Sequence, residues 1–190
     1  MKKTILFLVL LFLLHSDLYS QKISFAGENI TFRIENDYFY MNGTYYLENG
    51  RNQKIVLTYP FPHDSIYGPV DSIYIIDLTR NEIISNYKES KKGILFELNF
   101  HTEDELELQI SYCQKLLKHQ AEYILLSTWA WHQPLQFATY RLITPITMEI
   151  TSFSIQPDEF SVIGDQKVYS WKKKNFMPLL NMIFQYSERK

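Results

Sequence analysis

The chain has 190 residues, 21% of them charged, and a formal net charge of −2 at pH 7. This near balance of charges argues against a nucleic-acid-binding protein that works through a basic surface. The single cysteine, Cys113, excludes an internal disulfide, so packing alone must stabilise the fold. Aromatic residues make up 16% of the chain, and together with many Ile, Leu and Thr residues they favour strands over helices.

The first twenty residues have the pattern of a secretory signal peptide. Lys2 and Lys3 precede an apolar run over residues 5–14, and a more polar stretch ends at Ser20. The run is too short for a bilayer, which needs about 20 apolar residues. We predict cleavage after Ser20, export to the periplasm or the cell exterior, and no stable membrane span afterwards. The alternative is an uncleaved N-terminal anchor.

Residues 21–190 have the length of one domain with a substantial core. Cleavage would remove Lys2, Lys3 and Asp17 and leave 17 basic and 20 acidic residues, a net charge of −3. No repeat, linker or low-complexity tract divides this stretch. We therefore expect a single domain over residues 21–190.

Apolar side chains occupy every second position in three segments, which is typical of half-buried antiparallel strands. The alternating positions are Ile30, Phe32 and Ile34; Ile94, Phe96, Leu98 and Phe100; and Leu106, Leu108, Ile110 and Tyr112. Further strands are expected over residues 43–48, 54–59, 72–78, 83–88, 122–128, 139–144, 147–155, 167–172 and 179–186. The pattern predicts an all-β protein, an antiparallel sandwich of two sheets with about ten strands and at most one short helix.

Two segments allow another interpretation. Residues 106–117 also fit one face of a helix, although the period-two match is cleaner and favours a strand through Tyr112. Residues 132–138 could form a helical or irregular piece, because Pro134 suits a turn or the first position of a helix.

No nucleophile motif or zinc-peptidase motif occurs in the chain. His101, Glu103, Asp104 and Glu105 could hold a metal ion, but they lack the spacing and the glycine of a calcium loop and fit a solvated turn between two strands better. His63 and Asp64 could be part of an acid–base pair, but a proline-shaped loop with Phe61 buried is the preferred interpretation. The sequence predicts no catalytic residue, no metal site and no cofactor.

The segment around Trp129 and Trp131 is unusual. On a strand, two tryptophans spaced by one residue would share a face, either as a sugar-stacking platform or, the preferred interpretation, as an anchor in the core. His132 beside them is expected to be a hydrogen-bonded structural residue. If the protein binds a ligand through aromatic side chains, the candidate residues are Trp129, Trp131, His132 and Trp171.

Several short segments together resemble a family of exported bacterial proteins of unknown function with an extracellular β-sandwich. They are GTYYLEN at 43–49, YPFP at 59–62, TWAWHQP at 128–134, and Trp171 followed by NFMP at 175–178. The resemblance implies the location and the fold, and it provides no catalytic residues.

Three functions are compatible with these features. The first is an exported, non-enzymatic protein that binds a partner protein or a glycan through its loops or an aromatic face. The second is an envelope hydrolase whose site combines Asp64, His101, Glu103 and Asp104. The third is a structural subunit that joins a surface assembly through an open sheet edge.

Overall fold

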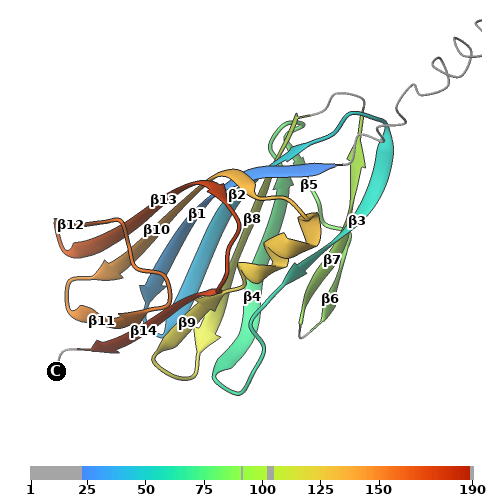
Figure 1. Cartoon of the computed structure of the whole chain (residues 1–190). Coiled ribbons are helices and arrows are strands. Elements are labelled where there is room, and N and C mark those ends of the chain that lie inside the picture. The colour runs from blue at the N-terminus through green and yellow to red at the C-terminus, as the bar shows by residue number, and fades with distance from the viewer. Residues whose placement is uncertain (1–22, 91, 102–104, 189–190) are drawn as a thin grey trace, which may run out of the picture.

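A computed structural model describes residues 23–90, 92–101 and 105–188 of the chain. The predicted signal peptide lies outside these residues. Fourteen strands and one short 3₁₀-helix, η1, make up the described part (Figure 1). No helix in that part of the chain is long and apolar enough to cross a membrane.

The elements follow one another along the chain in a simple order. They are β1 Ser24–Glu35, β2 Tyr38–Glu48, β3 Gln53–Pro60, β4 Tyr67–Asp77, β5 Glu82–Ile83, β6 Tyr87–Ser90, β7 Gly93–Phe100, β8 Glu105–Leu116, β9 Gln120–Tyr123, η1 Leu126–Trp131, β10 Leu135–Pro145, β11 Met148–Phe153, β12 Glu159–Ile163, β13 Gln166–Phe176 and β14 Met182–Glu188.

One layer of the molecule is an eight-stranded sheet in the order β12-β13-β10-β1-β2-β8-β4-β5. All neighbours in this sheet are antiparallel except β1 and β10, which run parallel. The inward face of β1 carries Ile30, Phe32 and Ile34, none of which is more than 2% exposed. The alternation in the sequence therefore reflects one face packed on a core and one face toward solvent.

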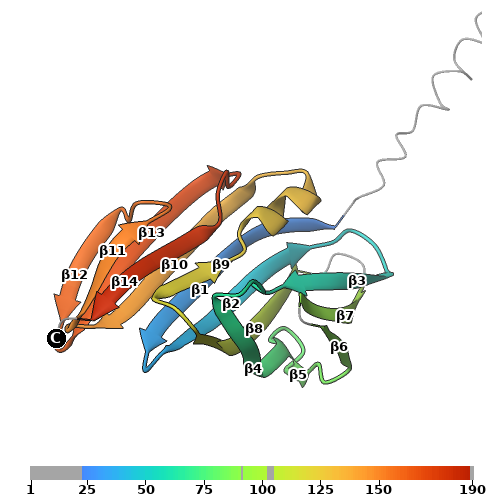
Figure 2. The same cartoon turned by 90° about the horizontal axis from the view of Figure 1, so that it is seen from below.

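Two three-stranded sheets, β11-β14-β9 and β3-β7-β6, form the second layer. Phe184 of β14 lies 5.5 Å from Phe32 of β1 between ring centroids, and Tyr59 of β3 lies 5.7 Å from Tyr45 of β2. Both small sheets thus pack on the same face of the large sheet. Figure 2 shows β14 and β9 toward one end and β3 and β7 toward the other. The arrangement is a β-sandwich whose second layer is interrupted.

The prediction of a mostly β, sandwich-like protein is confirmed, but the prediction of two sheets and about ten strands is wrong. Among the strands of the described residues, β9 pairs only with β14 and β3 pairs only with β7, so the second layer divides into two sheets. Several of the additional strands are too short or too exposed to show alternation, as in β12, where every residue is exposed.

The predicted strand over 122–128 ends at Tyr123, and the only helix of the described residues follows it. Leu126 N–H donates to the side chain of Asn181, and Thr128 N–H donates to the carbonyl of Leu125. These bonds turn the chain into η1, so the helical piece precedes residues 132–138, which begin with a bend and continue into β10. The strand interpretation of residues 106–117 is confirmed as far as Leu116, because β8 runs over Glu105–Leu116.

Trp171 is fully buried, and its indole N–H donates to the carbonyl of Ile155 at 3.0 Å. We expect Trp171→Ala to lower the free energy of unfolding by about 3–5 kcal/mol, because it opens a large cavity and removes a hydrogen bond. Trp129→Ala, at a tryptophan that is 49% exposed, is the control and should cost clearly less. Chemical denaturation of both variants measures the difference, and equal losses would contradict this placement of Trp171.

Candidate functional site

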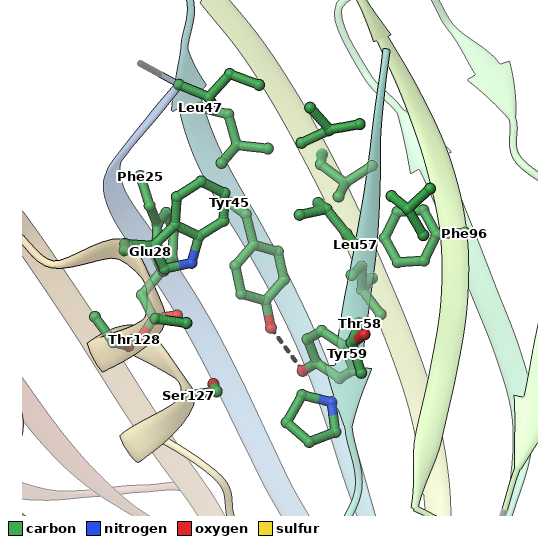
Figure 3. Close-up of a pocket in the computed structure, with 18 of the residues that line it drawn as sticks. Phe25, Glu28, Tyr45, Leu47, Leu57, Thr58, Tyr59, Phe96, Ser127 and Thr128 are labelled. Carbon is green, nitrogen blue, oxygen red and sulfur yellow. Dashed lines mark hydrogen bonds between the residues drawn. The ribbon is translucent and has the colours of Figure 1, made fainter.

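An apolar cavity of about 600 Å³ lies between the inner face of the large sheet, β3 and η1 (Figure 3). Phe25 of β1, Tyr45 and Leu47 of β2, and Leu108 of β8 line its floor. Its side walls come from β3, Phe96 of β7 and the residues of η1. It lies where the second layer passes from one small sheet to the other, and η1 covers part of the gap.

The rim of the cavity is accessible to solvent on two sides. Val56 and Thr58 of β3 are exposed and line the cavity from one side, and Ser127 and Ala130 of η1 are exposed and line it from the other. A ligand would therefore enter between β3 and η1.

Glu28 of β1 is a carboxylate on the apolar face of the sheet. The register of β1 against β2 shifts between Phe25 and Gly27, so that a bulge lies at Ala26. After the bulge, Glu28 lies two residues before Ile30 on the strand, so both side chains face inward. The side chain of Glu28 lines the cavity and, at 1% exposure, is buried.

Tyrosine hydroxyls surround this carboxylate. Tyr140 of β10 donates to Glu28 Oε1 at 2.6 Å, and Tyr123 of β9 donates to Glu28 Oε2 at 3.0 Å. The hydroxyl of Tyr45 lies 3.2 Å from that of Tyr123 and 2.7 Å from that of Tyr59 on β3. The four hydroxyls and Glu28 join strands from the large sheet and from both small sheets in one network.

The geometry of the network fixes the direction of its hydrogen bonds when Glu28 is ionised. Each tyrosine hydroxyl has one proton, and a carboxylate only accepts. Because Tyr123 gives its proton to Glu28, its bond with Tyr45 is donated by Tyr45, and the bond between Tyr45 and Tyr59 is then donated by Tyr59. The sulfur of Met41, 3.9 Å from the Tyr45 hydroxyl and 3.8 Å from that of Tyr59, is a weaker acceptor for the same protons. All four protons are thus directed toward the carboxylate, and lone pairs remain on the oxygens of Tyr59 and Glu28.

Burial dominates the ionisation of these groups. It raises the pKa of Glu28 from 4.5 to about 7, although the hydrogen bonds from Tyr140 and Tyr123 act in the opposite direction. Burial also raises the pKa of Tyr45, Tyr59 and Tyr123 well above 10. These tyrosines stay protonated near neutral pH, whereas Glu28 changes its charge there.

Gly43 leaves room for the Tyr45 side chain on β2. A Cβ atom at Gly43 would lie 2.8 Å from the Tyr45 hydroxyl oxygen and 2.5 Å from Ile30 Cδ1. The absence of a side chain at Gly43 therefore lets the Tyr45 ring lie back along the strand, where its hydroxyl meets Tyr59 and Tyr123. The GTYYLEN segment thus has a structural role in the polar network.

The structure separates the two tryptophans of the TWAWHQP segment. A 3₁₀-helix has about three residues per turn, so positions two apart point in different directions and do not share a face as they would on a strand. Trp131 lines the cavity and packs on Phe25, with 5.6 Å between ring centroids. Trp129 is 49% exposed, and its indole N–H donates to the carbonyl of Pro178. They form no common stacking platform.

The other two candidate ligand-binding residues lie outside the cavity wall. His132 is exposed and ends η1 in a left-handed conformation, with φ of 58°. Its backbone N–H donates to the carbonyl of Trp129. Trp171 is fully buried in the core and has no surface to offer a ligand. The four predicted residues therefore do not make one site.

The proposed acid–base and metal residues are not assembled in the described part of the chain. Glu103 and Asp104 lie outside the described residues. Asp64 accepts a hydrogen bond from the backbone N–H of Ile66 at 2.8 Å within the loop before β4. Among the described residues, no group of three or more His, Cys, Asp or Glu side chains lies close enough to hold a metal ion.

Sequence reasoning missed Glu28 and the tyrosines around it. One signal was available, because the alternation of Ile34, Phe32 and Ile30 continues backward to Glu28, a charged residue at an inward position. The tyrosines had no comparable signal. Tyr123 and Tyr140 are 95 and 112 positions from Glu28 along the chain, and only the strand pairing brings them to it.

No protein-family model matches this chain, and no curated protein matches it at a significant level. Among solved structures, it is similar to a candidate nutrient-binding protein of Legionella pneumophila, with a TM-score of 0.69 and 12% identity over 88% of this chain and 67% of that protein. It is also similar to an M1 zinc metallopeptidase of Deinococcus radiodurans, with a TM-score of 0.55 and 9% identity over 87% of this chain. This chain spans 42% of that peptidase. At such identities, the likeness shows the fold alone.

The raised pKa of Glu28 makes stability depend on pH. Between pH 4.5 and about 7 the folded protein keeps a proton that the unfolded chain loses. The stabilisation from this proton is complete below pH 4.5 and is lost as the pH rises to about 7, a change of roughly 3 kcal/mol. We expect Glu28→Gln to remove this part of the dependence. Denaturation midpoints of both proteins from pH 4.5 to 8 measure it, and parallel curves would contradict the burial of an ionisable Glu28.

Proposed function

We propose that this protein is an exported binding protein that takes an apolar small molecule into the cavity between β3 and η1. The cavity itself supports this proposal. Its volume of about 600 Å³ falls within the range of about 300–1,000 Å³ that is usual for small-molecule sites. Its lining is mainly aliphatic and aromatic, which is also usual for such sites, and its polar side chains come from the sheet floor, from the β2–β3 turn and β3, and from η1.

The construction of the cavity favours a preformed site. Its floor belongs to paired strands of the large sheet, and Tyr59 on its β3 wall is hydrogen-bonded to Tyr45 on the floor. A wall that is already ordered loses little conformational freedom when a ligand binds. The similarity in fold to a candidate nutrient-binding protein is also in accord with a binding role.

The cavity favours an apolar ligand over a glycan. A sugar needs many hydrogen-bonding partners, because each buried hydroxyl without one carries a desolvation penalty. The lining offers Phe25, Leu47, Ile55, Leu57, Phe96, Leu108 and Ile110, which have no polar side-chain atoms. The separation of Trp129 from Trp131 also removes the stacking surface that would have suited a sugar ring.

If the cavity binds apolar chains, affinity should rise with chain length. Burying one methylene is worth about 0.8 kcal/mol, which is roughly a fourfold change in Kd. We therefore expect the Kd of straight-chain primary alcohols to fall roughly fourfold per added carbon from hexanol until the cavity is full. Titration calorimetry measures Kd, and the fluorescence of Trp131, which lines the cavity, reports the place of binding.

A pair of substitutions on η1 tests whether the cavity is the site. Ala130 is exposed at the rim, and Ala130→Trp should block entry and weaken alcohol binding at least about tenfold. Leu126→Trp adds the same indole on the same helix at an exposed residue that is not part of the lining, and should leave binding unchanged. Equal effects of the two substitutions, or no dependence on chain length, would refute the proposed function.

A further inference from the structure

The network of Glu28 and the tyrosines at the floor of the cavity has unused hydrogen-bond acceptors but no unused donors. With Glu28 ionised, the protons of Tyr140 and Tyr123 go to its two oxygens, and those of Tyr45 and Tyr59 pass along the chain toward it. Each carboxylate oxygen has a second lone pair, and the oxygen of Tyr59 accepts none of these bonds. A ligand group that meets this network therefore meets acceptors.

The charges of the lining are also arranged asymmetrically. Glu28 and Arg51 are its two charged residues. Glu28 lies within the sheet, opposite Tyr45 in the register of β1 and β2. Arg51 is exposed in the turn between β2 and β3, beyond the last register pair of these strands, Ser24 and Glu48. Negative charge is thus buried inside the cavity, and the positive charge of the lining lies in solvent at the turn between β2 and β3.

We propose that the ligand of this cavity is a lipophilic amine, whose ammonium group pairs with Glu28 while its hydrocarbon part fills the apolar space. This inference rests on the proposed function and specifies its ligand class. An ammonium group has three N–H donors and no acceptor, which complements the lone pairs that Glu28 and Tyr59 offer. Its positive charge also compensates a carboxylate that is otherwise buried among neutral groups.

A negatively charged ligand fits this cavity less well. A carboxylate ligand placed beside Glu28 would bring two like charges together in an apolar space, so one of them would have to bind a proton. A fatty acid could instead leave its carboxylate in solvent near Arg51 and bury its chain against Glu28. In that case, binding would not depend on an ionised Glu28, and this difference makes the two arrangements distinguishable.

Three ligands with the same ten-carbon chain separate the possibilities: decylamine, 1-decanol and decanoate. Titration calorimetry of the purified protein at pH 8 gives the Kd of each. Because charge-assisted hydrogen bonds are markedly stronger than neutral ones, we expect decylamine to bind at least about tenfold more tightly than 1-decanol. We expect decanoate to bind most weakly.

Substitution of the carboxylate tests its part in this preference. In Glu28→Gln, the affinity for decylamine should fall to that for 1-decanol, whereas the affinity for 1-decanol should change little. Glu35→Gln, which also lies on β1 but at a partly exposed position, is the matched control and should keep the preference.

The unsubstituted protein provides a second measurement that needs no variant. An alkylammonium group, like the lysine side chain, stays protonated between pH 5.5 and 8.5. Glu28 must release its proton to pair with it, so the affinity for decylamine should fall about tenfold or more between pH 8.5 and 5.5, given the raised pKa of this group. The other ionisable groups of the network, Tyr45, Tyr59, Tyr123 and Tyr140, have raised pKa values and remain neutral throughout.

The possible outcomes separate this inference from the function on which it rests. Tight binding of 1-decanol with no preference for decylamine, or a preference for decanoate, would overturn the assignment of an amine and leave the apolar cavity site intact. Failure of all three ligands to bind would refute the proposed function itself. A preference for decylamine that disappears in Glu28→Gln and at low pH, but not in Glu35→Gln, would support both.

Discussion

The burial of one carboxyl group beneath tyrosine hydroxyls connects most of the structure. Glu28 lies on a strand of the large sheet, and its hydrogen-bonded partners come from β10 of the same sheet and β9 of a small sheet. The network continues through Tyr45 to Tyr59 on the other small sheet. The two halves of the interrupted second layer are therefore linked to the same group, and the cavity lies beside that link.

A buried charge requires such a setting, because its transfer from water is unfavourable unless it is hydrogen-bonded. Two tyrosines compensate only part of this penalty, so the pKa of Glu28 is raised. A fully apolar residue in its place would pack without this penalty. Both the carboxylate and the adjoining cavity lower the stability that the fold could otherwise have. In proteins whose other residues suit the fold, a local loss of stability of this kind is typical of a functional site.

The parts of this structure that could be predicted from sequence are those that depend on neighbours along the chain. The alternation in residues 30–34 and 94–100 identified strands because each strand buries one face. The division of the second layer could not be predicted, because it depends on whether β9 pairs with β14 or with β3. The tryptophan pair was misplaced for a similar reason: Asn181, more than 50 residues away, accepts a hydrogen bond from Leu126 and helps to hold the chain in η1.

The position of Glu28 illustrates how far local reasoning extends into the site. The alternation of β1 placed it on the inward face, and a charged residue on that face is informative because it is rarely buried without a partner. What local reasoning lacked was the partner set, since Tyr123 and Tyr140 reach Glu28 through long-range pairing. If a lysine or arginine side chain contacted Glu28 inside the fold, the two would form a structural ion pair and the charge of Glu28 would already be balanced. Neutral tyrosines instead leave the negative charge unbalanced by any cation of the cavity lining except the solvent-exposed Arg51. A cationic ligand is the group that would balance this charge from within.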